Sequence, residues 1–141
     1  MRYLAIDPGT KRTGLAVGDD ETHQAGPVGV IETSDPPTLL RRIRDAIDEH
    51  GPDALVIGIP FNMDGSEGPQ AKKARALAML LRQHTALAVH EVDERLTSFE
   101  ADDQMKQTGY TRKQKKARRD ALAAAAILRD FLSRENKTTE Q

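Results

Sequence analysis

Hydrophobic and polar residues alternate along the first part of the chain. Near its start, Leu4 and Ile6 fall on one side of an extended backbone and Asp7 falls on the other. Residues 13–18 and 28–31 show a similar two-residue period. These segments predict three strands that form an antiparallel meander.

Further along the chain, the apolar residues take a helical spacing in some segments and form a continuous run in another. Leu39 and Ile43 recur on one helix face, after an Asp35 that is typical of a helix cap. Residues 54–59 are continuously apolar, as in a parallel strand covered on both faces. The predicted strands are residues 2–7, 13–18, 28–31, 54–59 and 86–92, and the predicted helices are residues 36–50, 69–85, 97–109 and 117–132.

This order of elements predicts an α/β fold with one five-stranded mixed sheet flanked by helices. The meander comes first, and right-handed crossovers then add parallel strands. We expect residues 1–134 to form a single domain and residues 135–141 to form a disordered polar tail.

The composition excludes several kinds of site. The chain of 141 residues has no cysteine, so it forms no disulfide and offers no thiolate to a metal, and its 4 histidines are too scattered for a zinc site. No apolar stretch approaches the roughly 20 residues that cross a bilayer. The chain also opens with a strand-like segment rather than a secretion signal. We therefore expect a cytoplasmic protein that does not bind membranes.

Charge is distributed unevenly along the chain. Residues 1–69 carry 6 Lys and Arg against 12 Asp and Glu, a net charge of −6, whereas residues 70–141 carry 15 against 10, a net charge of +5. An acidic half joined to a basic half suits a cation site beside a surface that binds a polyanion.

Three acidic residues occupy positions that are typical of a functional site. Asp7 ends the first predicted strand, on the side that carries small residues. Glu94, next to Asp93, follows the fifth predicted strand, near the edge where open α/β sheets bind ligands. Asp120 shares a helix face with Ile127 and several alanines, where an unpaired buried carboxylate would be unfavourable.

Each acid also has an ordinary structural interpretation. Asp7 could be a turn residue, because aspartate is common in turns. The acidic and basic side chains of residues 93–95 could simply be solvated. Asp120 could lie in the first turn of its helix and pair with Arg118 or Arg119. The functional interpretation therefore depends on whether the three carboxylates converge.

Convergence would create a site for hard divalent cations. Nearby carboxylates repel one another unless a cation neutralises them, and oxygen ligands favour Mg²⁺ or Mn²⁺. Glycines and an alanine opposite Asp7, at residues 14–18, would leave room for hydrated ions. Two such ions about 3.5–4 Å apart can stabilise the attacking and leaving oxygens of a phosphodiester. We therefore predict metal-dependent hydrolysis of nucleic acid.

Polar and basic residues near these acids predict a surface that binds phosphate groups. The chain has only 2 Tyr, 3 Phe and no Trp, so phosphate contacts should outweigh base stacking and make binding sensitive to salt. Residues 110–119 are predicted to be a basic connector before the last helix, and such a run of cations is also typical of a plain solvated surface. The candidate nucleic-acid-binding residues are Thr10, Lys11, Arg12, Asn62, Arg95, Arg112, Lys113, Lys115, Lys116 and Arg118.

Four ordered segments resemble the signature blocks of a known family. Residues 7–14 read DPGTKRTG, residues 58–66 read GIPFNMDGS, residues 92–98 read VDERLTS and residues 120–125 read DALAAA. Together they resemble the bacterial pre-16S rRNA nuclease family, also described as Holliday-junction-resolvase-like and called YqgF or RuvX. The resemblance covers nearly the whole chain.

The resemblance implies a ribonuclease-H-like fold and divalent-metal-dependent cleavage of phosphodiester bonds. The implied substrate is the 5′ end of precursor 16S rRNA, with structured or branched DNA as the alternative, and the protein would act as a monomer or homodimer. By motif, Asp7, Glu94 and Asp120 would be the catalytic acids that bind the metal. Asp93 would instead orient Arg95 or a backbone turn.

Two residues depart from the pattern of the family. Gly58 stands where junction-resolving relatives carry an acid on the fourth strand, so the acid after the fifth strand would have to substitute for it. Arg119 stands before Asp120, where we expect an apolar residue.

Three other functions are compatible with these residues. Asp-x-Gly-Thr before a hairpin also opens actin-like and sugar-kinase ATPases, but those proteins need two copies of the fold. A non-catalytic RNA-binding factor of ribosome assembly would use the same surface without cleavage. A resolvase of four-way DNA junctions would need a two-fold dimer with two active sites.

Overall fold

The computed structural model describes residues 1–96 and 112–139. Within these ranges it gives the side chains of residues 1–95 and 119–134. The predicted helix 97–109 lies outside the described residues. The elements are β1 Arg2–Pro8, β2 Thr13–Asp19, β3 Gln24–Ile31, α1 Pro36–His50, β4 Ala54–Ile59, α2 Pro69–His84, β5 Ala88–Asp93, η1 Glu94–Leu96 and α4 Arg112–Thr139.

The five strands form one mixed sheet in the order β3-β2-β1-β4-β5. The first three strands pair antiparallel, whereas β1 and β4, and then β4 and β5, pair parallel. The predicted meander and the predicted five-stranded mixed sheet are therefore confirmed. The carboxyl ends of β1, β4 and β5 meet at one edge of the sheet, because these three strands run in the same direction.

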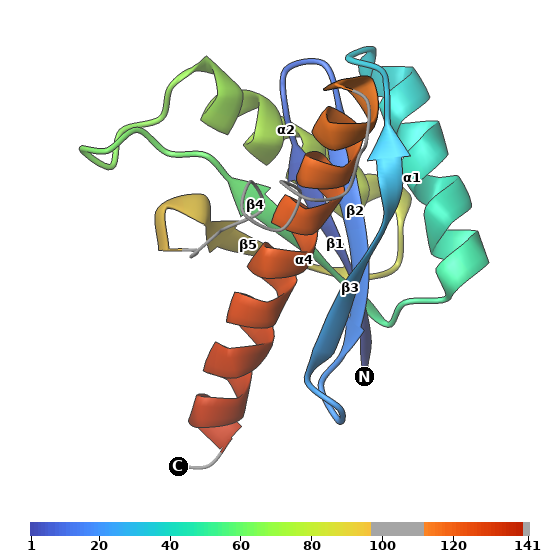
Figure 1. Cartoon of the computed structure of the whole chain (residues 1–141), viewed down its shortest axis with the longest axis vertical. Helices are drawn as coiled ribbons and strands as arrows, with labels where there is room; N and C mark the ends of the chain where they lie inside the picture. Colours follow the sequence, from blue (N-terminus) through green and yellow to red (C-terminus); the bar gives the residue numbers. More distant parts are fainter. Residues whose placement is uncertain (97–111, 140–141) are drawn as a thin grey trace.

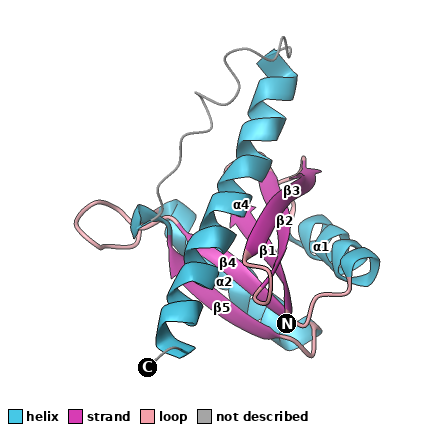
Figure 2. Cartoon of the chain, turned by 60° about the horizontal axis from the view of Figure 1, so that its bottom comes forward, coloured by secondary structure: helices cyan, strands magenta, loops and turns pink. Residues whose placement is uncertain are grey.

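Helices cover both faces of the sheet. In Figure 1, α4 lies across the front of the sheet, and α1 and α2 lie behind it; Figure 2 shows the same layers from a second direction. Leu4 and Ile6 of β1 pack in the core toward α1 and α2, whereas Tyr3 and Ala5 pack toward α4. The alternation predicted along β1 is therefore confirmed, and it places Asp7 on the α4 face.

Local signals explain where α1 begins and ends. The Asp35 carboxylate accepts a hydrogen bond from the backbone N–H of Thr38 at 3.2 Å, which caps the first turn. Gly51 ends the helix in the left-handed region, with φ of 58°, where glycine has no steric penalty. The predicted bounds of this helix are confirmed.

The predicted bounds of two elements are wrong. β3 begins at Gln24 rather than residue 28, because it is an edge strand that tolerates Pro27. The last helix runs from Arg112 to Thr139 rather than from 117 to 132. The basic segment predicted as a connector is thus largely helical, since it is rich in Arg, Lys, Gln and Ala and contains neither Gly nor Pro.

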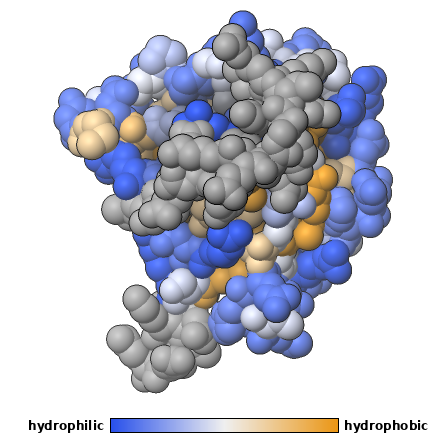
Figure 3. Space-filling view, viewed as in Figure 1, coloured by the Kyte–Doolittle hydropathy of each residue, from blue (hydrophilic) through white to orange (hydrophobic). Residues whose placement is uncertain are grey.

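The surface around α4 is mixed in polarity. Figure 3 shows this face, with hydrophilic residues toward its edges and apolar residues that reach the surface near its middle. None of the helices in the described part of the chain has the length and apolar character needed to span a membrane.

Candidate active site

Asp7 lies near the carboxyl end of β1 and is partly buried beneath the α4 layer. It pairs in the sheet with Gly14 of β2. Burial is the largest influence on its carboxyl group and raises the pKa of Asp7, and the negative charge of Asp120 raises it further. The interpretation of Asp7 as a plain turn residue does not account for this buried position beside two other acids.

Glu94 begins η1, directly after β5, and its carboxyl group reaches across to β4. A Cβ atom built on Gly58 would lie 2.6 Å from Oε1 of Glu94. The glycine therefore leaves the space that the Glu94 side chain fills. The carboxyl group of Glu94 thus lies beside the position on β4 where the family resemblance leads us to expect an acid.

The Asp7 and Glu94 carboxyl groups form a coupled pair. Burial, followed by a hydrogen bond with Asp7, raises the pKa of Glu94 to about 9. Oε1 of Glu94 is buried and has no hydrogen-bond partner among the described residues. Buried polar atoms in proteins usually have a partner, so this oxygen is available for a ligand.

Asp120 lies on α4, above β2. Its Oδ2 accepts a hydrogen bond from Nε of Arg12 at 2.9 Å, which makes a partly buried ion pair. Because α4 begins at Arg112, Asp120 lies two turns inside the helix, and the helix N-terminus does not solvate it. The alternative that placed Asp120 in the first turn is therefore wrong.

Small residues on β2 and β4 allow α4 to approach the sheet closely. A Cβ atom on Gly14 would lie 2.0 Å from the backbone oxygen of Asp120, and one on Gly18 would lie 2.8 Å from the side chain of Leu128. The space directly above Gly14, which was predicted to be open for hydrated cations, is thus taken by the backbone of α4. Sequence reasoning identified the small residues but missed their role, because it did not place α4 over them.

The described side chains bring Asp7 and Glu94 into contact and place Asp120 close enough to influence Asp7. Among these residues, no three Asp, Glu, His or Cys side chains are close enough to enclose a metal ion. The ion pair with Arg12 accounts for the position of the third carboxylate. Two of the three predicted acids are therefore assembled, and the third lies beside them.

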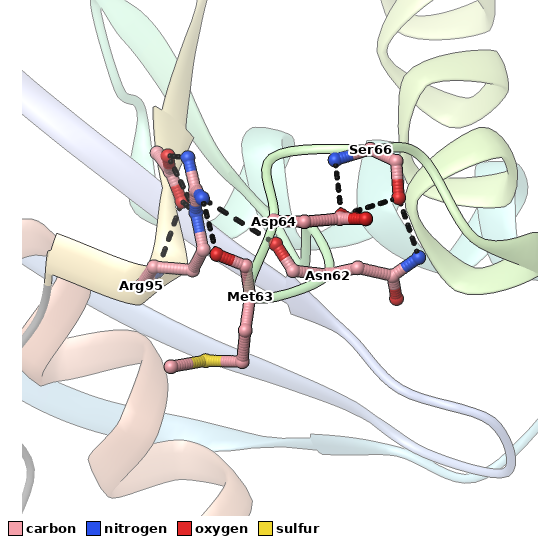
Figure 4. A network of polar contacts seen from close by, with 6 residues as sticks. Asn62, Met63, Asp64, Ser66 and Arg95 are labelled. Atoms are coloured by element: carbon pink, nitrogen blue, oxygen red, sulfur yellow. Dashed lines mark hydrogen bonds and ion pairs between the residues drawn. The ribbon is translucent and has the colours of Figure 1, made fainter.

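Arg95 anchors the loop that follows β4. Its guanidinium forms a bidentate ion pair with Asp93, with distances of 2.7–3.1 Å, and its Nη1 donates to the carbonyl oxygens of Asn62 and Met63 at 3.4 and 3.3 Å. Figure 4 shows this network next to the turn that Asn62 and Ser66 close. Asp93 orients Arg95, as the family resemblance implies.

The other predicted nucleic-acid-binding residues are distributed around this edge of the sheet. Thr10 and Lys11 are exposed in the turn after β1 and have no side-chain partner among the described residues. The side chain of Asn62 donates to Ser66 at 3.0 Å. The predicted basic residues of the last segment lie on α4, and their side chains fall outside the described residues: Arg112, Lys113, Lys115, Lys116 and Arg118.

Comparison with known proteins agrees with this architecture. The family model RuvX, described as Holliday junction resolvase, matches residues 1–134. The chain belongs to the RuvX family. The resemblance inferred from the four sequence blocks is therefore confirmed.

RuvX relatives match over almost their full length. A protein of Anaeromyxobacter sp. (strain Fw109-5) is 40% identical over 94% of this chain and 96% of its own, and one of Opitutus terrae is 41% identical over 94% and 91%. Both are named as candidate pre-16S rRNA nucleases.

Solved structures identify the fold of this RuvX chain. RuvC of T. thermophilus, in complex with a Holliday junction substrate, matches 98% of this chain and 97% of its own, with a TM-score of 0.62 and 17% identity. The yeast mitochondrial Holliday junction resolvase Ydc2 matches 98% and 80%, with a TM-score of 0.65 and 11% identity. The predicted ribonuclease-H-like fold is confirmed.

Proposed function

We propose that this RuvX-family protein is a nuclease that hydrolyses phosphodiester bonds with Mg²⁺ or Mn²⁺. The observation that carries the proposal is the position of Glu94, whose Oε1 lies above Gly58 beside Asp7, buried and without a hydrogen-bond partner among the described residues. A pair of partly buried carboxyl groups with a free oxygen suits a hard cation, which would relieve their mutual repulsion.

Asp7, Glu94 and Asp120 would hold the metal. When bound, it would polarise the phosphodiester and activate water, and two ions are the arrangement that we expect from this chemistry. Arg12 keeps Asp120 beside Asp7 by a hydrogen bond of 2.9 Å, and also limits the repulsion between the acids. Release of Asp120 from Arg12 would add the third carboxylate to the pair.

The surrounding residues would position the substrate. Lys11 and Thr10 lie in the turn after Asp7, and their polar groups, which have no partner in the described part of the chain, could bind phosphate oxygens. Arg95 would act mainly by holding the loop after β4, since its guanidinium is already bonded to Asp93 and to two carbonyl oxygens.

The proposed substrate is the 5′ end of precursor 16S rRNA, processed in the cytoplasm during ribosome biogenesis. This choice is supported by the names of relatives that align over more than 90% of both chains. We further propose that residues 1–134, the range matched by the family model, form the nuclease domain.

A four-way DNA junction is the second candidate substrate. It is favoured by the description of the family and by the similarity of the fold to RuvC. Symmetric cleavage of a junction would require a dimer with two active sites, whereas processing of one RNA end requires a single site.

The experiment that tests the proposed function gives both substrates to one preparation of the protein. Cleavage of precursor rRNA and of a synthetic four-way junction is measured with Mg²⁺, with Mn²⁺ and with EDTA. We expect metal-dependent cleavage and faster cleavage of the rRNA. Paired nicks in the junction, made by a species that sediments as a dimer, would favour the resolvase. Binding without cleavage of either substrate under both metals would favour a non-catalytic assembly factor.

A further inference from the structure

A small pocket lies at the carboxyl edge of the sheet, on the side of α1 and α2. It has a volume of about 180 Å³, and the turn after β1, the segment before α1 and one side of α2 form its walls. Pro8, Pro36, Leu77 and Leu80 make these walls largely apolar. The pocket lies across the sheet from α4, because Leu77 belongs to the core beneath α1 and α2.

Polar side chains surround this apolar interior. Thr10, Ser34 and Gln70 line the pocket, and none of their side chains has a hydrogen-bond partner among the described residues. Lys73 also lines it, is exposed, and pairs with no carboxylate in the same part of the structure. Apolar walls suit the faces of a planar ring, free polar groups suit its edges, and a free ammonium suits a nearby phosphate.

The size and position of the pocket narrow the choice of ligand. Its volume of about 180 Å³ is below the range of about 300–1,000 Å³ that is typical of sites for drug-sized ligands, so it suits one ring system. Pro8 and Thr10 lie one and three positions after Asp7 in the sequence. A nucleic-acid strand that crosses this edge of the sheet can therefore contact the carboxylates and the pocket together.

We propose that this pocket binds one unpaired base of the nucleic-acid substrate, next to the phosphodiester cleaved beside Asp7. The proposal rests on the proposed nuclease function. Bases held outside a stack commonly bind in pockets with apolar walls and polar edges. The pocket would fix which phosphodiester reaches the carboxylates, and would give preference to single-stranded or frayed segments.

The test fills the pocket without changing the core. Ala76 lines the pocket and is exposed on α2, so Ala76→Trp should fold and occupy the space. Met79→Trp is the matched control, because Met79 is 58% exposed on the same helix and does not line the pocket. Leu80→Ala, which removes one wall, is a second variant, and circular dichroism checks the folding of all three.

Two substrates, one with bases and one without, separate base binding from hydrolysis of the phosphodiester. We expect Ala76→Trp to lower kcat/KM for single-stranded RNA about tenfold, with Met79→Trp within about twofold of the wild type. Hydrolysis of bis(p-nitrophenyl) phosphate, which has no base, should be equal in all variants. Removal of one base near the cleaved bond should slow the wild type and Met79→Trp but not Ala76→Trp.

Equal cleavage of RNA by Ala76→Trp, Leu80→Ala and Met79→Trp would overturn the pocket proposal. Failure of the wild type to hydrolyse either substrate with Mg²⁺ or Mn²⁺ would instead overturn the nuclease function. Fluorescence anisotropy with the same RNA then tests binding by the pocket independently of cleavage. Weaker binding by Ala76→Trp than by Met79→Trp supports the pocket, and equal binding contradicts it.

Discussion

The two faces of the sheet are built from different residues. Toward α1 and α2, the strands present large aliphatic side chains such as Leu4 and Ile57. Toward α4, they present mainly small residues, such as Ala16 and Gly14, and α4 itself contributes a run of alanines. The large side chains of the first face fill the core, whereas the small residues of the second face let the backbone of α4 come close to the sheet. The difference indicates that one sheet separates the stability of the fold from the positioning of its acids.

The largest effect on stability should come from the face that packs against α1 and α2. Leu4 is fully buried there, so Leu4→Ala should lower the free energy of unfolding by about 2–5 kcal/mol. Cleavage well below the melting temperature should stay near the wild-type rate. Urea unfolding measures the change, with the exposed Met79→Ala as control. A loss of activity in the folded variant would show that the two faces are not separate.

A change on the α4 face should affect activity more than stability. A Cβ atom on Gly14 would lie 2.0 Å from the backbone oxygen of Asp120, so Gly14→Ala must displace α4. We expect a cost of about 1–3 kcal/mol in the free energy of unfolding. Cleavage should fall about 100-fold, because small misplacements of catalytic groups have effects of this size.

The matched control for this change is Gly26→Ala on β3, where an added Cβ atom meets no atom of the described residues within 4 Å. It should cleave at the wild-type rate. Wild-type activity in Gly14→Ala would contradict the idea that close helix approach positions Asp120.

The metal-free protein should lose stability as the pH rises, because Glu94 holds a proton in the folded state. Its pKa is about 9 in the folded state against 4.5 in a free side chain, so the folded state binds the proton more tightly. The stability linked to this proton is complete below pH 4.5 and is lost as the pH rises toward 9. Glu94→Gln does not titrate, and at pH 8 it should exceed the wild type by about 1–3 kcal/mol in free energy of unfolding.

Thermal unfolding in EDTA across this pH range measures the effect of Glu94→Gln. The control is Glu49→Gln, because Glu49 is exposed on α1. Parallel pH profiles for the wild type and Glu94→Gln would contradict the buried position of this acid.

The smallest predicted effect concerns the loop after β4. Arg95→Lys keeps the charge but loses the planar group that bonds Asp93 and two carbonyl oxygens, so the loop should open more often. The backbone N–H groups of Gly65 and Ser66 should then exchange hydrogen faster. Mass-detected hydrogen exchange measures this, with Arg44→Lys on α1 as control. Unchanged exchange in this loop would show that Arg95 does not hold it.

Much of the fold could be predicted because its signals are local. The alternation along β1, the cap at Asp35 and the continuous apolar run of β4 each depend on nearby residues, and the structure confirms all three. The start of α4 was predicted too late, because a basic run was interpreted as a connector although its residues favour a helix.

The candidate acids could be selected from the sequence, but their contacts could not. The ion pair between Arg12 and Asp120 joins residues 108 positions apart, and no local pattern predicts it. The glycines gave a usable signal, since Gly58 and Gly14 mark places where Glu94 and α4 approach. Which groups approach these glycines depends on the topology of the sheet, and the sequence pattern alone did not reveal it.

We propose that Asp7, supported by Glu94 and Asp120, enables metal-dependent cleavage of nucleic acid. The most direct measurement is cleavage of precursor rRNA by the wild type and Asp7→Asn with Mn²⁺ or Mg²⁺, with RNA affinity and melting temperature measured on the same samples. We predict that Asp7→Asn folds and binds RNA but cleaves no faster than the EDTA control. Cleavage by Asp7→Asn at the wild-type rate would contradict the claim.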